Sequence, residues 1–179
     1  MMPLTEVETT NTMQKEAGST NTPGLNGDMR DMVVIQFGGR IVKGFTNRSL
    51  WPTESDPGAA FTSAPLVFQG ESTIREIPLD GVKAAFFVKT FEGKSHDDLR
   101  FHDHLAPVDC LWVRVTFEDG EIIEGLIRNN SNYVLQQAFF MSPIDPEGNN
   151  SLVYVLKAKL KNIEVLGLRA APRSFPNPA

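Results

Sequence analysis

The apolar positions of this chain follow the two-residue period of β-strands. The clearest alternation occurs twice, in Val33, Ile35 and Phe37 and again in Val113, Val115 and Phe117. Period-two alternation that is carried by β-branched and aromatic residues is typical of a strand with one buried face. No long amphipathic helix is visible anywhere in the chain. The pattern therefore predicts an all-β fold.

A hairpin pattern also occurs twice, and each copy ends in a glycine within the returning strand, at Gly44 and Gly125. A second echo links residues 79–84 with 160–165, and the interval is constant: 125 − 44 = 81 and 160 − 79 = 81. A glycine inside a strand marks a bulge, a bend or a close backbone approach. We predict two tandem small β-barrel units that are related by internal duplication.

Changes in composition set the expected boundaries. Residues 1–31 and 168–179 lack periodic apolar positions, and we expect them to be disordered tails. The remainder divides into a first β-barrel unit at 32–91, a polar connector at 92–110 and a second β-barrel unit at 111–167.

The charge and the apolar runs narrow the class of protein. A net charge of −5 gives the chain as a whole no attraction to phosphate backbones, so we do not expect DNA binding. We find no apolar run long enough to span a membrane and no signal peptide, and we expect a cytoplasmic protein without a membrane partner. The single cysteine, Cys110, allows no intrachain disulfide.

Candidate chemistry is sparse. All three histidines, His96, His102 and His104, lie in the connector among aspartates, which makes them weak candidates for metal ligands. The favoured interpretation is a solvated acidic connector, because such a segment does not preorganise ligands. A hydrolytic triad needs a histidine in a rigid element, and no glycine-rich phosphate loop occurs. We predict no catalytic residues and no cofactor.

Adjacent phenylalanines are the candidates for a protein interface. Neighbouring strand residues face opposite sides of a sheet, so one member of Phe86-Phe87 and of Phe139-Phe140 should enter a core. The other member needs the sister unit or a partner to cover it. The interface candidates are Phe87, Phe91 and Phe140, and packing between the two units is favoured over an external site.

A polar-aromatic cluster follows the second hairpin and supplies the RNA-binding candidates, Arg128, Asn130, Asn132 and Tyr133. Asparagine can read base edges and tyrosine can stack on a base. Ordinary turn chemistry explains the same residues, and it is the favoured interpretation.

The second hairpin resembles the first motif of the Sm-like fold, through the residues Val113, Val115, Phe117, Asp119-Gly120, Gly125 and Ile127. That fold is a strongly bent, five-stranded small barrel that Sm and Hfq proteins use to bind RNA in rings. The resemblance implies Sm/SH3-like units and makes RNA a possible partner. The second Sm motif, with its Arg-Gly pair, is not present.

A longer stretch, about residues 33–167, is similar to a bacterial domain family with no assigned activity, notably in the block from Phe86 to Gly93. We therefore expect a non-catalytic bacterial binding or scaffold module that acts through protein–protein contacts and could serve regulation. Its partner would be another protein or a second copy of the chain. The alternative is an Sm-like single-stranded RNA-binding protein.

Overall fold

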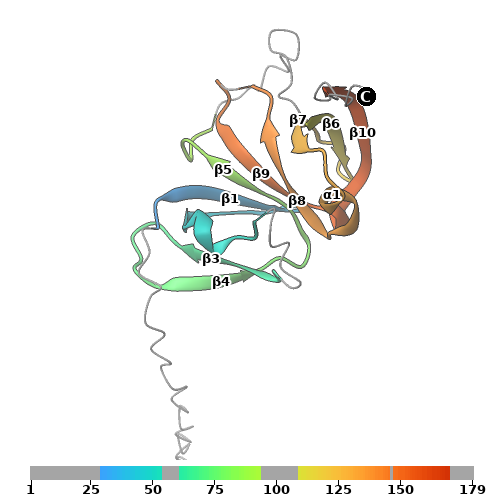
Figure 1. The fold of residues 1–179 in the computed structure, drawn as a ribbon. Helices are drawn as coiled ribbons and strands as arrows, with labels where there is room; N and C mark the ends of the chain where they lie inside the picture. The colour runs from blue at the N-terminus through green and yellow to red at the C-terminus, as the bar shows by residue number, and fades with distance from the viewer. Residues whose placement is uncertain (1–28, 54–60, 94–108, 146, 170–179) are drawn as a thin grey trace, which may run out of the picture.

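The computed structural model describes residues 29–53, 61–93, 109–145 and 147–169, and within them the chain is all-β (Figure 1). The strands of the first half are β1 (Asp31–Phe37), β2 (Ile41–Thr46), β3 (Ser63–Val67), β4 (Ile74–Pro78) and β5 (Val82–Val88). Those of the second half are β6 (Cys110–Phe117), β7 (Ile122–Arg128), β8 (Ala138–Pro143), β9 (Asn150–Leu156) and β10 (Leu160–Arg169).

Helical structure is confined to short connections in the described residues. These are the 3-10 turns η1 (Arg48–Leu50) and η2 (Lys157–Lys159) and the single helix α1 (Asn132–Leu135). None of the described helices has the length and apolar character needed to cross a bilayer. Residues 1–28 and 170–179 of the predicted tails, and residues 94–108 of the predicted connector, lie outside the described residues. At the boundaries of these segments, Asp31 begins β1, Cys110 begins β6, and Leu168 and Arg169 end β10.

All ten strands belong to one antiparallel sheet in the order β10-β6-β7-β8-β9-β5-β1-β2-β3-β4. The all-β prediction is confirmed, but the sheet is not closed into a barrel, so the prediction of two barrels is wrong in that respect. The reason is that β5 pairs with β9 of the other half. This pairing occupies the edges through which β5 would meet β4 and β9 would meet β10.

The two halves nevertheless repeat one strand order, β5-β1-β2-β3-β4 and β10-β6-β7-β8-β9. The last strands of the two halves, β5 and β10, do not align in the way that the repeat of residues 79–84 in 160–165 predicted. Val82 pairs with Phe37 and Leu160 pairs with Phe117, and each strand then skips one residue. The interval between the last strands is therefore 160 − 82 = 78. The expected interval of 81 is wrong there, because the stretch from the second strand to the fourth is longer in the first half (Thr46 to Ile74) than in the second (Arg128 to Asn150).

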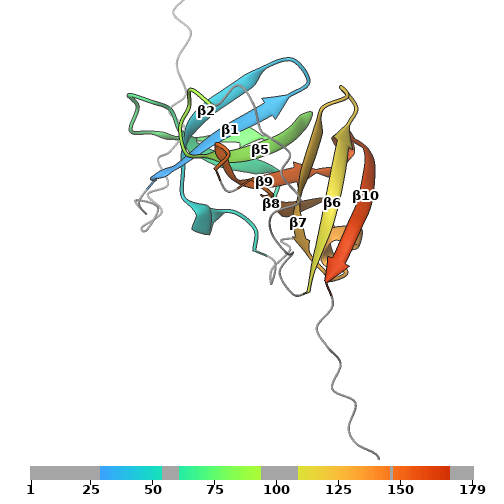
Figure 2. The same ribbon diagram turned by 90° about the horizontal axis from the view of Figure 1, so that it is seen from above.

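The pairing of β5 with β9, called the joint from here on, lies at the middle of the sheet (Figure 2). Its side chains enter both hydrophobic cores. Every residue of β5 is buried. Phe86 packs into the core of the second half and Phe87 into the core of the first. From β9, Val153 enters the second core and Tyr154 the first. Each buried aromatic contributes about 1.5–3 kcal/mol, so the halves stabilise one another.

The two strand glycines allow a close approach where the second and third strands of each half meet. A Cβ at Gly125 would lie 2.4 Å from Met141 Cγ and 2.7 Å from the Ser142 carbonyl oxygen. A Cβ at Gly44 would lie 3.0 Å from Leu66 Cδ2. Of the three predicted roles of a strand glycine, the close approach is the one that both halves show.

Substituting Gly125 by alanine should lower the free energy of unfolding by about 1–3 kcal/mol, because a backbone oxygen cannot move aside cheaply. Gly38→Ala is the matched control: nothing lies within 4 Å of its Cβ position, and the change should stay below about 1 kcal/mol. Urea unfolding of both variants measures the difference. Equal stability of the two variants would show that the contact does not constrain the fold.

Candidate functional site

The strand β10 forms one free edge of the sheet. Its ten residues pair only with β6 among the described strands, so one row of backbone N–H and C=O groups has no strand beside it. Val165 and Leu168 are 54% and 53% exposed along this strand. An edge of this kind can accept a further strand through main-chain hydrogen bonds. β10 is therefore a candidate protein-contact surface.

The other free edge is β4, at the opposite end of the sheet (Figure 1). Among the described strands it pairs with β3 alone, and it carries Arg75 and Glu76, which are both exposed, before it ends at Pro78. Charges and a terminal proline restrict which strands can pair with an edge. Arg75 donates to Glu71 at 2.9 Å, an exposed ion pair that costs little to rearrange.

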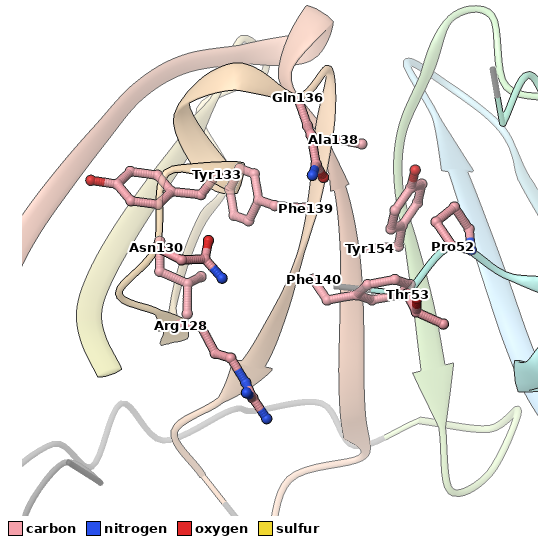
Figure 3. A pocket seen from close by; sticks show the side chains of 11 residues that line it. Pro52, Thr53, Arg128, Asn130, Tyr133, Gln136, Ala138, Phe139, Phe140 and Tyr154 are labelled. Carbon is pink, nitrogen blue, oxygen red and sulfur yellow. The ribbon is translucent and has the colours of Figure 1, made fainter. Parts of the chain in front are cut away.

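A small pocket lies where the second half meets the segment after η1 (Figure 3). Its lining includes Pro52, Thr53, Arg128, Asn130, Tyr133, Gln136, Phe139, Phe140 and Tyr154. Three of the RNA-binding candidates thus share one pocket, while Asn132 lies in α1 and its side chain is outside the described residues. The volume is about 30 Å³, the room of about one water molecule.

Polar and aromatic side chains share the lining of this pocket. The hydroxyl of Tyr133 points away from Phe140 and Tyr154 (Figure 3). Burial raises the pKa of Tyr154 to about 12, so its hydroxyl stays protonated and can donate. Gln136 Nε2 is buried, and no hydrogen-bond partner for it lies in the described residues. The Arg48 guanidinium carbon lies 3.7 Å from the centre of the Phe140 ring, a cation–π contact that covers the ring from the first half.

A wider cleft of about 270 Å³ lies over β1, β2 and β5. Its apolar floor includes Val34 and Phe86, and Lys43, Glu121 and Asn149 are among its polar lining residues. The half-buried Phe91 lines one wall, with its ring 5.3 Å from that of Phe45. Two of the interface candidates therefore reach a surface hollow, Phe91 here and Phe140 in the small pocket.

Phe87 lies in the joint between the halves. It is 5% exposed, and its ring lies 5.1 Å from that of Trp51 and 6.4 Å from that of Phe140. The sister unit covers this side chain, as the favoured interpretation of the phenylalanine pairs predicted. Phe87 therefore holds the two halves together and is not accessible to an external partner.

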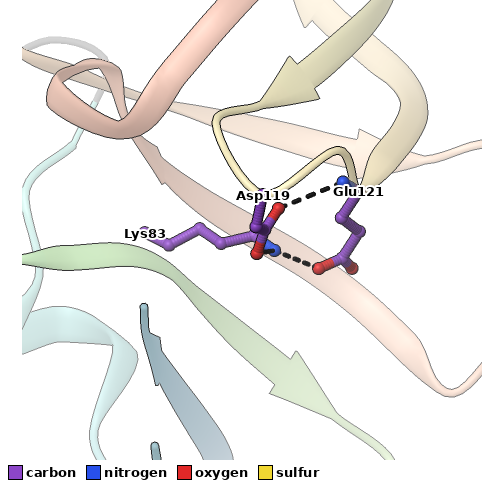
Figure 4. Close-up of polar contacts among 3 residues, drawn as sticks. All are labelled: Lys83, Asp119 and Glu121. Atoms are coloured by element: carbon purple, nitrogen blue, oxygen red, sulfur yellow. Dashed lines mark hydrogen bonds and ion pairs between the residues drawn. The ribbon is translucent and has the colours of Figure 1, made fainter. Parts of the chain in front are cut away.

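A cluster of charged side chains connects the β6–β7 hairpin of the second half to β5 of the first half (Figure 4). Lys83 is the residue of β5 that the pairing with β1 skips, and its side chain is buried. It donates to Asp119 at 2.6 Å and to Glu121, which both lie in the β6–β7 turn. Its ammonium also lies 4.6 Å from the centre of the Phe117 ring. The β6–β7 turn is one residue longer than its counterpart at 38–40, and that longer turn carries both carboxylates.

Asp119 should make the joint sensitive to acid. The hydrogen bond from Lys83 and the backbone N–H of Glu121 lower the pKa of Asp119 from 3.8. A lowered pKa in the folded state stabilises the fold above the unfolded-state pKa, and this contribution is lost as the pH falls through the folded-state pKa. The stability difference between wild type and Asp119→Asn should therefore shrink below about pH 3.8.

Urea titrations of both proteins between pH 7 and the acid range measure this difference. Asp145→Asn is the control, because the Asp145 carboxylate accepts a local hydrogen bond from the backbone N–H of Glu147 within its own turn. A difference that does not change with pH would contradict the role of the ion pair.

The remaining sequence candidates are placed as follows. His96, His102 and His104 lie outside the described residues. Within the described part of the chain, no group of three or more His, Cys, Asp or Glu side chains is placed to hold a metal ion. Sequence reasoning missed Val165 and Leu168, because an open edge depends on which strands pair. It also missed the exposed Val134 and Leu135, because they lie in the four-residue helix α1, which is too short to show a helical period in the sequence.

These features define an all-β protein whose described strands form one open antiparallel sheet with a free edge at each end. The chain matches a family of unknown function, DUF6982, over residues 29–167, and it belongs to that family. The comparisons with curated proteins and with solved structures gave no match.

Proposed function

We propose that this protein is a non-catalytic, cytoplasmic bacterial binding or scaffold module that acts through protein–protein contacts. In this proposal its halves are Sm/SH3-like small β-units that arose by internal duplication. The observation that carries the function is the open β10 edge with its exposed Val165 and Leu168. A partner would add a strand to this edge, with main-chain hydrogen bonds for affinity and alternate side chains for specificity.

The interior of the chain supports this mode of binding, since β5 and β9 join two five-stranded units by strand addition. The titratable cluster of Lys83, Asp119 and Glu121 fits the non-catalytic part of the proposal. Its charged groups are engaged with one another across the joint, and of the three residues Glu121 also lines the wider cleft over β1, β2 and β5.

Photo-crosslinking tests the β10 edge directly. The full chain carries p-benzoylphenylalanine in place of Val165, and cells of the native host are irradiated before the adducts are identified by mass spectrometry. We expect covalent adducts with protein. Ile122 is the matched control position, because it is equally apolar and 50% exposed but lies on β7, away from the free edges.

Adducts at both positions alike, or at neither, would contradict a contact at the β10 edge. Adducts with RNA at position 165 would contradict a protein partner. A protein adduct specific to position 165 supports the proposal whether the partner is a different protein or this chain itself.

Single-stranded RNA binding is the second candidate, because Arg128, Asn130 and Tyr133 converge on one pocket beside Phe140. This function predicts salt-sensitive binding, with a loss of at least about tenfold in affinity when Arg128 and Tyr133 are both replaced by alanine. The small volume of the pocket and the net charge of −5 favour the protein-contact function instead.

Fluorescence anisotropy with labelled oligo-U and oligo-A measures this binding at several salt concentrations. The protein-contact function predicts the same weak binding for the wild type and for the Arg128→Ala/Tyr133→Ala variant. Saturable binding that the double variant loses would favour the RNA function over the proposed one.

A further inference from the structure

We propose that the partner of the β10 edge is the β4 edge of a second copy of this chain, so that copies add head to tail. This inference rests on the proposed function and names its partner. Inside one chain, β5 of the first half pairs with β9 of the second. By strand order β10 corresponds to β5, and β4 corresponds to β9. The two free edges are thus the counterparts of the two edges that already pair.

The internal joint also gives a register for the external one. Phe86 pairs with Val34 on β1, and Glu164 pairs with Arg114 at the same position of β6. Phe86 therefore corresponds to Glu164. On the other side of the joint, Val153 corresponds to Arg75, since these residues pair with Met141 and Leu66. Met141 and Leu66 are themselves the residues that contact the two strand glycines, which fixes their equivalence.

Within the joint, Phe86 pairs with Val153 and Phe87 pairs with Leu152. Transferred to the free edges, this register places Glu164 of one copy opposite Arg75 of the next. It places Val165 opposite Ile74 in the same way. Opposite charges and apolar side chains that face each other across strands both stabilise a sheet.

The side chains of this register are available in the single chain. Those of Glu164 and Arg75 are 46% and 55% exposed. Within its own copy Glu164 pairs with Arg114 and accepts a hydrogen bond from Asn162 at 2.9 Å. Arg75 pairs with Glu71, and its guanidinium carbon lies 5.2 Å from the centre of the Phe68 ring. Exposed pairs of this kind are worth little and can rearrange. Pro78 corresponds to Leu156, since they pair with Ser63 and Ala138 in the two halves. Leu156 follows Val155, which pairs with Ala84 in the joint. Pro78 therefore lies one residue beyond the transferred pairs.

The external joint lacks the ion cluster of the internal one. Lys161 takes the place of Lys83, and the turn that corresponds to Asp119 and Glu121 is Gly38-Gly39-Arg40, which has no carboxylate. Association should therefore be weaker than the internal pairing and should depend on concentration. A contact between two different edges is heterologous, so it leads to a ring if it closes and to a filament if it does not.

Charge reversal at the two edges tests the register with the purified full chain. Sedimentation velocity should show the mass of the wild type rising between about 10 µM and about 1 mM, the range of a small interface. Arg75→Glu and Glu164→Arg should each weaken association by about tenfold, because like charges then face each other. An equimolar mixture of the two variants should regain wild-type association, since the glutamate introduced in one variant then faces the arginine introduced in the other.

Glu92→Arg is the control for a charge change away from both edges, and circular dichroism confirms that every variant is folded. A monomer at all concentrations would overturn the head-to-tail inference. The protein-contact function would then be tested separately, by the crosslinks at position 165. Weakened association that the mixture does not restore would overturn the register. Association that neither reversal changes would overturn the use of these edges.

Discussion

The pairing of β5 with β9 is the constraint on which the rest of the structure depends. β5 is buried along its whole length because one face packs into each core, so neither half has a complete interior without the other. The same pairing removes the edges that would close each unit, and this keeps the sheet open. The free edges at β4 and β10, where we place the function, are therefore a consequence of how the two halves join.

The two halves have kept the same strand order while their joining edges have taken on different side chains. The inner joint is apolar on both faces and carries Lys83 with its two carboxylates. The outer strands carry charged residues among apolar ones, such as Glu164 beside Val165 on β10 and Arg75 beside Ile74 on β4. This difference suits a permanent joint inside the chain and a reversible one outside it, because charged edges resist indiscriminate pairing.

The period-two pattern was sufficient to predict the all-β class, and Gly44 and Gly125 were sufficient to mark two positions of close approach, since these signals are local. The sheet order could not be predicted, because it depends on the choice of β5 between β4 and β9, which is a contact between distant segments. For the same reason the sequence did not distinguish the buried Phe87 from the accessible Phe91. The open edge at Val165 and the ion cluster of Lys83 also follow from that choice.

Single-tryptophan variants test the dependence of each half on the other most directly, because Trp51 reports on the first half and Trp112 on the second. In Trp112→Phe and in Trp51→Phe, urea unfolding is followed by the fluorescence of the remaining tryptophan and by far-ultraviolet circular dichroism. If the β5–β9 joint makes one cooperative unit, the two signals will coincide in each variant. Circular dichroism that falls in two steps, with fluorescence following only one of them, would show that the halves fold independently and would contradict the central role of the joint.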